Sequence, residues 1–407
     1  MNIISKLKLF AAVITSLMML IGVNSFALKG NHKGVPSIGS MVIMSGLENP
    51  WDLAFTKDMK AMFFTEKSKG LSVQVGGAVH KLVGIKGSSG YGMQADDLFT
   101  YGGQEGMLGV ELDNNFKKNR TLFLYSTSNK YMGDGCKKDN YASCFGNIVM
   151  KFTVAKDFKS VSNRVDIVKD IQFKPFKSDQ PFGGPGAHNG GRMRMDSEGY
   201  LWVGTGDRHW GPGPQDKNVI AGKVLRIDGD GNGHPGNKIK ESGGRIYTYG
   251  HRNVQGIAIH PTVNAIWAHE HGPQGGDELN IVTSGTNYGW PVITYGKNYV
   301  FGTDIGEGTH KKGMAQPIRF WVPSIAPSGM IFYTGDKFKK WRGNLLIGSL
   351  KFQQLVRLKL KKNDVVTEER LFSEKFGRIR DVKQGPNGYI YLLTDSKNGK
   401  LIKLKPQ

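Results

Sequence analysis

Apolar and polar residues follow one another in short runs along most of the chain, and six of these runs share a single design. Each is a turn rich in Gly, Asn, Asp or Lys followed by a stretch of aromatic and β-branched residues, which is typical of a β-strand. The six segments are residues 58–65, 118–125, 197–204, 262–269, 341–348 and 386–393. Recurring turn–strand units predict an all-β repeat protein, and six units predict a six-bladed β-propeller. A pair of packed β-sandwiches is the structural alternative.

The spacing of the six segments is irregular, which predicts long loops between some of the strands. In a propeller such loops gather on one face and build the functional site. The 56 glycines agree with this architecture, because tight hairpins need positive φ angles that Gly adopts without strain. Residues 41–44 are also strand-like, and we interpret them as the strand that closes the ring by completing the last blade.

The first 27 residues combine two early lysines, an apolar stretch over residues 9–23 and the small residue Ala27. This is the layout of a cleaved secretory signal peptide. An uncleaved anchor is the alternative, but residues 9–23 fall short of the roughly 20 apolar residues that span a bilayer. We therefore expect a signal peptide over residues 1–27 and one propeller domain over residues 28–407. That domain would be periplasmic or secreted and not embedded in a membrane.

The chain has two cysteines, Cys136 and Cys144, which lie within one polar loop. Export to an oxidising compartment favours a local disulfide between them. Two free thiols are the alternative.

The formal net charge is +21, which would attract anionic lipid or acidic protein partners. The lysines are scattered and no nucleic-acid recognition motif is present, so we do not expect nucleic-acid binding. A general surface property of the source organism is the alternative explanation of the charge.

The richest stretch for chemistry runs from His188 to Asp207. His188 precedes one predicted strand and Asp207 follows the next, so a hairpin would return both to the same end of a blade. An imidazole backed by a carboxylate is a general base held in one tautomer. A loop histidine is more often a surface or hydrogen-bonding residue, and spacing alone does not decide between the two.

A second cluster spans residues 249–256, 269–280 and 287–291. Its carboxylates lie beside Gly and Pro carbonyls, which together form the hard oxygen set that Ca²⁺ prefers. Zinc is the competing interpretation, because three histidines lie close in sequence, but they lack the usual ligand spacing. The three are His251, His269 and His271.

Basic residues recur near the C-terminus, at Lys351, Arg378 and Arg380. Arg378 and Arg380 share one face of a strand and can point jointly at an anionic ligand. A solvated strand edge is the alternative. No nucleophile elbow, dinucleotide fingerprint, P-loop or haem motif is present, so a redox cofactor would have to bind non-covalently.

The chain resembles the soluble, pyrroloquinoline-quinone (PQQ) dependent aldose sugar dehydrogenases, relatives of soluble quinoprotein glucose dehydrogenase. The similarity runs from residue 47 to the end of the chain. It is carried by residues 103–109, 188–207, 250–256, 270–278, 323–329 and 377–381. Two segments, residues 129–145 and 183–186, depart from the family pattern and leave the sugar preference open.

The resemblance implies oxidation of an aldose at its anomeric carbon to the lactone. His188 would take the hydroxyl proton while hydride passes to PQQ, Asp207 would orient His188, and Arg252 would stabilise the charge that the quinone gains. Electrons would then pass to a separate soluble or membrane acceptor. The residues implied in cofactor binding are Gln104, Arg252, Asn253, Tyr299, Ser349, Leu350, Lys351, Arg378, Ile379 and Arg380.

Two calcium roles follow from the same resemblance. The carbonyls of Gly272 and Pro273 match positions that hold a catalytic Ca²⁺ against PQQ. Glu278 and the carbonyl of Tyr288 match a second, structural Ca²⁺ site. A monomer and a dimer both remain open.

The enzymatic alternative is a calcium-dependent lactonase-type hydrolase, and the non-enzymatic alternative is a propeller that only binds a sugar or a protein. A hydrolase would need a metal-bound water and no basic cage. Lys351, Arg378 and Arg380 therefore favour the quinone cofactor.

Overall fold

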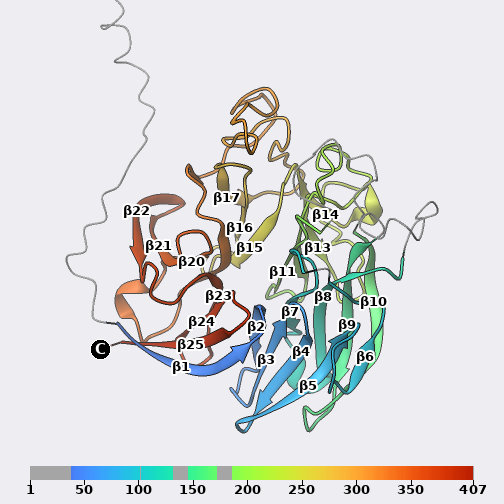
Figure 1. The fold of residues 1–407 in the computed structure, drawn as a ribbon. Coiled ribbons are helices and arrows are strands. Elements are labelled where there is room, and N and C mark those ends of the chain that lie inside the picture. Colours follow the sequence, from blue (N-terminus) through green and yellow to red (C-terminus); the bar gives the residue numbers. More distant parts are fainter. Residues whose placement is uncertain (1–37, 101, 132–144, 172–185, 407) are drawn as a thin grey trace, which may run out of the picture. The chain divides into compact units, whose positions relative to one another are not determined.

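Six β-sheets arranged in a ring make up the described part of the chain, as Figure 1 shows. The computed structural model describes residues 38–100, 102–131, 145–171 and 186–406. Five sheets have four strands and one has five, and consecutive strands within a sheet are antiparallel except for the last pair of the five-stranded sheet. The predicted six-bladed β-propeller is confirmed. The expected signal peptide and both cysteines lie outside the described residues.

Within each blade the chain runs from the innermost strand outward. The first blade contains β2 (Pro50–Phe55), β3 (Ala61–Glu66), β4 (Gly70–Val75), β5 (Ala78–Ile85) and β6 (Met93–Ala95). The second contains β7 (Met107–Leu112), β8 (Thr121–Ser128), β9 (Gly146–Val154) and β10 (Val161–Ile171). The third contains β11 (Gly190–Met195), β12 (Leu201–Thr205), β13 (Lys223–Ile227) and β14 (Ile246–Tyr249).

The remaining blades follow the same order. The fourth contains β15 (Val254–Ile259), β16 (Ile266–Glu270), β17 (Asp277–Val282) and β18 (Arg319–Trp321). The fifth contains β19 (Pro327–Phe332), β20 (Leu345–Ser349), β21 (Gln354–Lys361) and β22 (Asp364–Leu371). The sixth contains β23 (Ile379–Gln384), β24 (Ile390–Thr394), β25 (Gly399–Pro406) and β1 (Ile38–Leu47).

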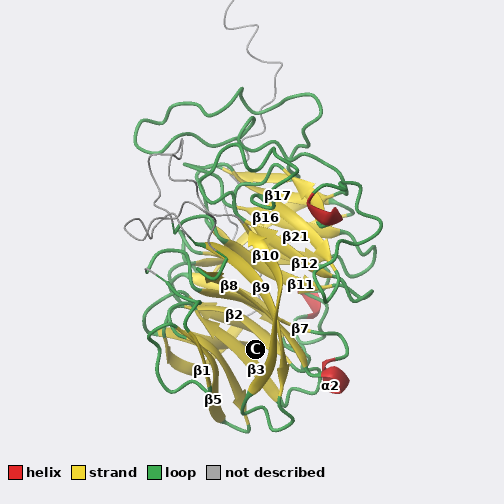
Figure 2. Cartoon of the chain, turned by 90° about the vertical axis from the view of Figure 1, so that its right-hand side faces the viewer, coloured by secondary structure: helices red, strands yellow, loops and turns green. Residues whose placement is uncertain are grey.

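Helical structure is confined to short turns among the described residues, as Figure 2 shows. They are α2 (Phe116–Asn119), η2 (Ser242–Gly244) and η3 (Lys339–Trp341). None of the helices in the described ranges is long and apolar enough to cross a membrane.

The six segments predicted from the sequence each supply the second strand of a different blade. They overlap β3, β8, β12, β16, β20 and β24, each of which ends one to three residues beyond its segment. These strands are packed on both faces by neighbouring blades, and every residue of β12, β16, β20 and β24 is buried. A strand buried on both faces is mostly apolar, and the apolar run at the start of each of these strands made them the most visible in the sequence.

The ring is closed by pairing the first described strand with the last. β1 lies antiparallel to β25, with Ile38 opposite Pro406 and Leu47 opposite Gly399. The prediction that residues 41–44 complete the last blade is therefore confirmed.

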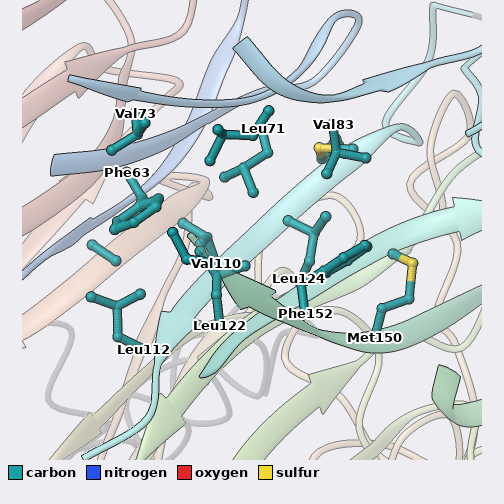
Figure 3. Packing of buried hydrophobic residues seen from close by; sticks show 14 of the residues in the cluster. Phe63, Leu71, Val73, Val83, Val110, Leu112, Leu122, Leu124, Met150 and Phe152 are labelled. Atoms are coloured by element: carbon teal, nitrogen blue, oxygen red, sulfur yellow. The ribbon is translucent and has the colours of Figure 1, made fainter. Parts of the chain in front are cut away.

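The apolar core lies between adjacent blades. Between the first and second blades, Phe63 and Val73 pack in one cluster with Val110 and Leu124, as Figure 3 shows. All four are fully buried. Burial of a side chain of this size contributes about 1.5–3 kcal/mol, so each interface between blades stabilises the ring substantially.

The innermost strands of neighbouring blades contact one another in a closed cycle: β2, β7, β11, β15, β19, β23 and back to β2. This close approach requires small residues where two backbones meet. A Cβ atom on Gly109 of β7 would lie 2.1 Å from the carbonyl oxygen of Gly191 in β11.

Replacing Gly109 by Ala is expected to lower the free energy of unfolding by about 1–3 kcal/mol, because the backbones of β7 and β11 would have to separate. Urea unfolding followed by tryptophan fluorescence measures this change. The control is Gly229→Ala, where an added Cβ would meet only a ring atom of Phe123 at 3.6 Å. Equal stability of the two variants would contradict the prediction.

Candidate active site

A cavity of about 240 Å³ lies at the centre of the ring. Every blade contributes to its lining, through the ends of the innermost strands or the loops that adjoin them. The contributions, in blade order, are Trp51, Gln104, Gly190, Gln255, Ala326 and Arg380. The cavity is therefore a product of ring closure and not of any single blade.

One wall of this central cavity is positively charged. Arg378 and Arg380 each place Nη2 within hydrogen-bond distance of Asp395 Oδ2, at 2.9 and 2.7 Å. Lys67, which also lines the cavity, donates from Nζ to the Gly103 carbonyl at 2.5 Å. Among the described residues that line the cavity, three cations therefore accompany a single carboxylate, which leaves an excess of positive charge for an anionic ligand.

The pKa values of the groups in this wall reflect the same excess of positive charge. Burial opposes ionisation of Asp395, but Arg380 and Arg378 outweigh it and hold the pKa of that carboxyl well below its usual range. Burial, and then the charge of Arg380, lowers the pKa of Lys67. The sequence predicted Arg378 and Arg380, whereas Lys67 and Asp395 were missed because nothing in their local sequence marks them.

His188 and Asp207 form a buried pair beside the cavity. His188 Nδ1 lies 2.6 Å from Asp207 Oδ1, and the indole Nε1 of Trp290 donates to Asp207 Oδ2 at 2.7 Å. Burial raises the pKa of Asp207, while Arg252 counteracts this effect. His188 itself has a φ of 52°, and its backbone N–H donates to Gln104 Oε1 at 3.0 Å. The structure therefore brings together the histidine and carboxylate that the sequence predicted as base and orienting group.

A second histidine, His209, contacts His188 and was not predicted from the sequence. The two Nε2 atoms are 2.8 Å apart, and the ring centroids are 3.8 Å apart. The backbone N–H of His209 also donates to Asp207 Oδ1 at 2.8 Å. Its position two residues after Asp207, in a loop rich in Gly and Pro, was the only signal in the sequence.

Arg252 and Asn253 connect this pair to the next blade. The backbone N–H of Asp207 donates to the Arg252 carbonyl at 2.7 Å. Arg252 Nη1 donates to the Gly272 carbonyl at 2.6 Å, and its guanidinium lies 5.2 Å from the centre of the Trp290 ring. Asn253 Oδ1 accepts from the backbone N–H of Gly190 at 3.1 Å, which fixes the end of β11.

Two further residues that were predicted to bind the cofactor lie on the fifth blade, in different environments. Leu350 lines the central cavity, and its carbonyl lies 3.5 Å from Arg378 Nη1. Lys351 is exposed next to it, with Nζ 5.6 Å from the centre of the Phe352 ring.

The side chains of Tyr299, Ser349 and Ile379 do not line the central cavity. Ser349 is fully buried and donates from Oγ to the Ile325 carbonyl at 2.7 Å. Ile379 is also fully buried, in the core between the last two blades. Tyr299 is 45% exposed on the long loop between β17 and β18. Any contact of Ser349 or Ile379 with a ligand would have to come from the backbone.

A second cavity, of only about 10 Å³, lies beside Arg252 and is lined by Gly272, Glu278 and Tyr288. It is close to the smallest space that holds one water molecule. Burial, and then the nearby Glu270, raises the pKa of Glu278 well above its usual range. The buried Glu270 and the half-buried Glu278 beside a small cavity form a site where a cation would be stabilised.

The three histidines considered for zinc differ in their surroundings. His251 lies 2.9 Å from Glu270 Oε1, and His271 Nε2 donates to the Pro327 carbonyl at 2.6 Å. Burial lowers the pKa of His271 to about 3 and that of His269 well below its usual range, so both are neutral. Within the described ranges, no three His, Cys, Asp or Glu side chains are grouped to hold a metal ion. A cation here would need backbone carbonyl ligands.

The protein is thus a six-bladed β-propeller with a buried histidine–carboxylate pair beside a positively charged central cavity. The chain belongs to the glucose/sorbosone dehydrogenase family, whose model matches residues 47–403.

Relatives of known name support this membership. Aldose sugar dehydrogenase YliI of Escherichia coli is 36% identical over 370 residues, which cover 90% of this chain and 92% of the relative. Quinoprotein glucose dehydrogenase B of Acinetobacter calcoaceticus is 25% identical, with 87% of this chain and 85% of the relative covered. The apo-form crystal structure of the soluble aldose sugar dehydrogenase of E. coli superposes with a TM-score of 0.78 at 34% identity, covering 91% of this chain and all of that one.

Proposed function

We propose that the protein is a PQQ- and Ca²⁺-dependent aldose sugar dehydrogenase that oxidises the anomeric carbon to the lactone and transfers the electrons to a separate acceptor. The observation that carries this proposal is the buried His188–Asp207 pair at the edge of a cationic cavity. The names of the relatives, an aldose sugar dehydrogenase and a quinoprotein glucose dehydrogenase, support the substrate class and the cofactor.

The central cavity suits an anionic, planar cofactor such as PQQ, which carries three carboxylates. Lys67, Arg378 and Arg380 would meet those carboxylates, since Asp395 is the one acidic side chain among the described residues that line the cavity. Trp51 adds a flat aromatic surface to the lining. When bound, PQQ would supply the redox chemistry by accepting a hydride, which no side chain can do.

Calcium would depend on oxygen atoms around Arg252. The Gly272 carbonyl accepts a hydrogen bond from Arg252, but a carbonyl oxygen has a second lone pair that can bind a cation. Together with the carbonyl of Pro273 it would hold a catalytic Ca²⁺, which acts as a Lewis acid. Glu278 and the carbonyl of Tyr288, beside the small cavity, would hold the structural ion.

The protein's own residues account for the proton transfer. His188 Nδ1–H donates to Asp207, so Nε2 carries the lone pair and takes the proton of the anomeric hydroxyl. The Asp207 carboxylate then stabilises the imidazolium, and the indole of Trp290 prevents that carboxylate from rotating. Arg252, whose charge counteracts the effect of burial on the pKa of Asp207, would stabilise negative charge that develops on the acceptor.

The test is dye-linked oxidation of aldoses by the purified protein, with PQQ and Ca²⁺ added together, singly and not at all. Activity that requires both additions is expected. Binding of PQQ without turnover of any aldose would show that the substrate class is wrong. Failure to bind PQQ would overturn the cofactor assignment.

Removing either cavity arginine is expected to weaken PQQ binding. Arg378→Ala and Arg380→Ala should each raise the Kd by about 10- to 100-fold, because a hydrogen bond to a charged group contributes about 1.5–3 kcal/mol. Quenching of tryptophan fluorescence on titration with PQQ measures the Kd. Arg342→Ala, on an exposed turn, is the matched control. Wild-type affinity in both cavity variants would contradict the assignment.

A further inference from the structure

We infer that the face of the ring opposite the central cavity binds the headgroups of anionic lipids and holds the protein at the surface of a membrane. The inference concerns a surface that the proposed mechanism does not use. It does not depend on the proposed dehydrogenase activity, because it rests only on the position and charge of the turns between strands.

The strand order of the blades determines which turns lie on this face. The innermost strands begin beside the central cavity, which is lined by Gly190 of β11 and Arg380 of β23. Consecutive strands are antiparallel, so the turns between the first and second strands and between the third and fourth strands lie at the other end of each blade. The six residues of β2 separate the two ends by about 20 Å.

The turns at this far end are strongly basic on four of the six blades. In the first, second, fifth and sixth blades they contain fifteen Lys and Arg residues, five Asp residues and no Glu. We call these turns and strand ends the basic face. They are residues 56–60, 113–120, 155–160, 333–344, 361–364 and 403–406.

The positive charge is not spread evenly around the ring. In the third blade the corresponding turns are residues 196–200 and 228–245, which carry five acidic and three basic residues. A charge that belonged to the whole surface would give every blade the same sign. The basic face is therefore a local feature of four blades, and a general surface property of the source organism does not explain it.

The basic face presents cations without exposed apolar groups. Twelve of its fifteen basic side chains are exposed, whereas Phe116, Phe338 and Trp341 in the same turns are buried. None of the large apolar side chains that are exposed in the described ranges lies on this face. A protein partner usually binds through aromatic and apolar side chains at the centre of an interface. An array of lipid phosphates needs only the cations.

Binding through this face would leave the central cavity open to solution. Attraction to a charged surface decays within a Debye length, which is about 10 Å at 0.1 M salt. The cavity lies about 20 Å away, at the other end of the innermost strands. Small molecules in solution could therefore still reach the cavity of a protein bound to a membrane.

Co-sedimentation of the purified protein with phospholipid vesicles tests the inference. Vesicles of phosphatidylglycerol and phosphatidylcholine in equal parts should bind the protein at about 0.1 M salt and release it at about 1 M salt, where the Debye length is about 3 Å. Vesicles of phosphatidylcholine alone should not bind it. Failure of the anionic vesicles to bind the protein at the lower salt concentration would overturn the inference.

Reversing three charges on the basic face tests whether this face makes the contact. The triple variant Lys118→Glu, Lys340→Glu and Lys362→Glu changes exposed side chains on the second and fifth blades. It should weaken vesicle binding by at least about 100-fold, because each basic residue near an anionic bilayer strengthens binding by about fivefold.

The matched control makes the same change in net charge at the cavity end of the ring. It is the triple variant Lys86→Glu, Lys375→Glu and Lys397→Glu, again at exposed positions. Its binding should stay within about tenfold of wild type, because these residues lie beyond the Debye length from the bilayer. Equal weakening in the two triple variants would show that net charge alone causes binding, and would overturn the inference.

Two measurements on the wild-type protein need no substitution. Hydrogen exchange should show that anionic vesicles protect the backbone of residues 333–344 and leave that of residues 395–398, at the cavity end, unchanged. The opposite pattern would overturn the inference. Tighter binding to polyglutamate than to vesicles at equal concentrations of negative charge would assign the basic face to an acidic protein, and would overturn it as well.

Discussion

Replacing His188 by Ala is expected to reduce kcat for aldose oxidation by about 10²- to 10⁴-fold, the usual contribution of a general base. The reason is that Nε2 of His188 is the atom that takes the hydroxyl proton, while Asp207 accepts only from Nδ1. The Kd for PQQ should change little, because the cationic wall of Arg378, Arg380 and Lys67 is separate from this pair. Steady-state kinetics with an artificial dye and a PQQ titration measure the two quantities.

His310→Ala, at an exposed position, is the control for the loss of an imidazole. If His188→Ala kept more than a tenth of the wild-type kcat, the base would have to be another group. Parallel loss of turnover and of PQQ affinity would show that His188 supports the cavity and does not act as the base.

The largest effect on stability is expected for Arg192→Ala, which should lower the free energy of unfolding by about 3–5 kcal/mol. Arg192 on β11 is fully buried, and its Nη1 lies 2.7 Å from Asp52 Oδ1 and 3.0 Å from Asp381 Oδ1. It thereby joins three innermost strands, β11, β2 and β23. Without the charge of Arg192, the two buried carboxylates would face each other. Urea unfolding measures the resulting loss of stability.

The pH dependence gives this prediction a second test. Burial raises the pKa of Asp381 to about 7, against the opposing charge of Arg192. A carboxyl whose pKa is raised on folding stabilises the protein fully below its unfolded pKa of about 3.8, and that contribution is lost as the pH rises to about 7. Loss of Arg192 raises the pKa of Asp381 further. The variant should therefore lose more unfolding free energy, relative to the wild type, at pH 8 than at pH 5. Equal deficits at the two pH values would contradict the prediction, and Arg342→Ala is the control.

The sequence revealed the second strands of the blades but not the innermost ones. Residues 201–205 of β12 are buried on both faces and apolar, so their pattern predicts a strand directly. The innermost strands β11 and β23 carry Arg192 and Asp381, whose charges are neutralised by partners more than 100 residues away in the chain. No local pattern contains that information, because only ring closure brings the partners together.

Side chains alternate between the two faces of a strand, and this rule predicts one feature of the observed site. Arg380 faces the cavity, so its neighbour Ile379 must point to the opposite face of β23, and it lies in the core. His209 could not be placed in this way. Its contact with His188 depends on a left-handed backbone conformation, with a φ of 56° at His209. The sequence does not predict such an angle, because residues other than Gly seldom adopt it.

The pairing of β1 with β25 makes synthesis of residues 399–406 a condition for closing the ring. β1 is synthesised before every other described strand, and β25, its one partner among those strands, is synthesised after all of them. Until then β1 and β24 both have an unpaired edge, and such edges are templates for pairing with other chains. A polypeptide that stopped before residue 399 would keep both edges and could not form the sixth blade. Truncation near the C-terminus would therefore produce an aggregation-prone chain rather than a smaller propeller.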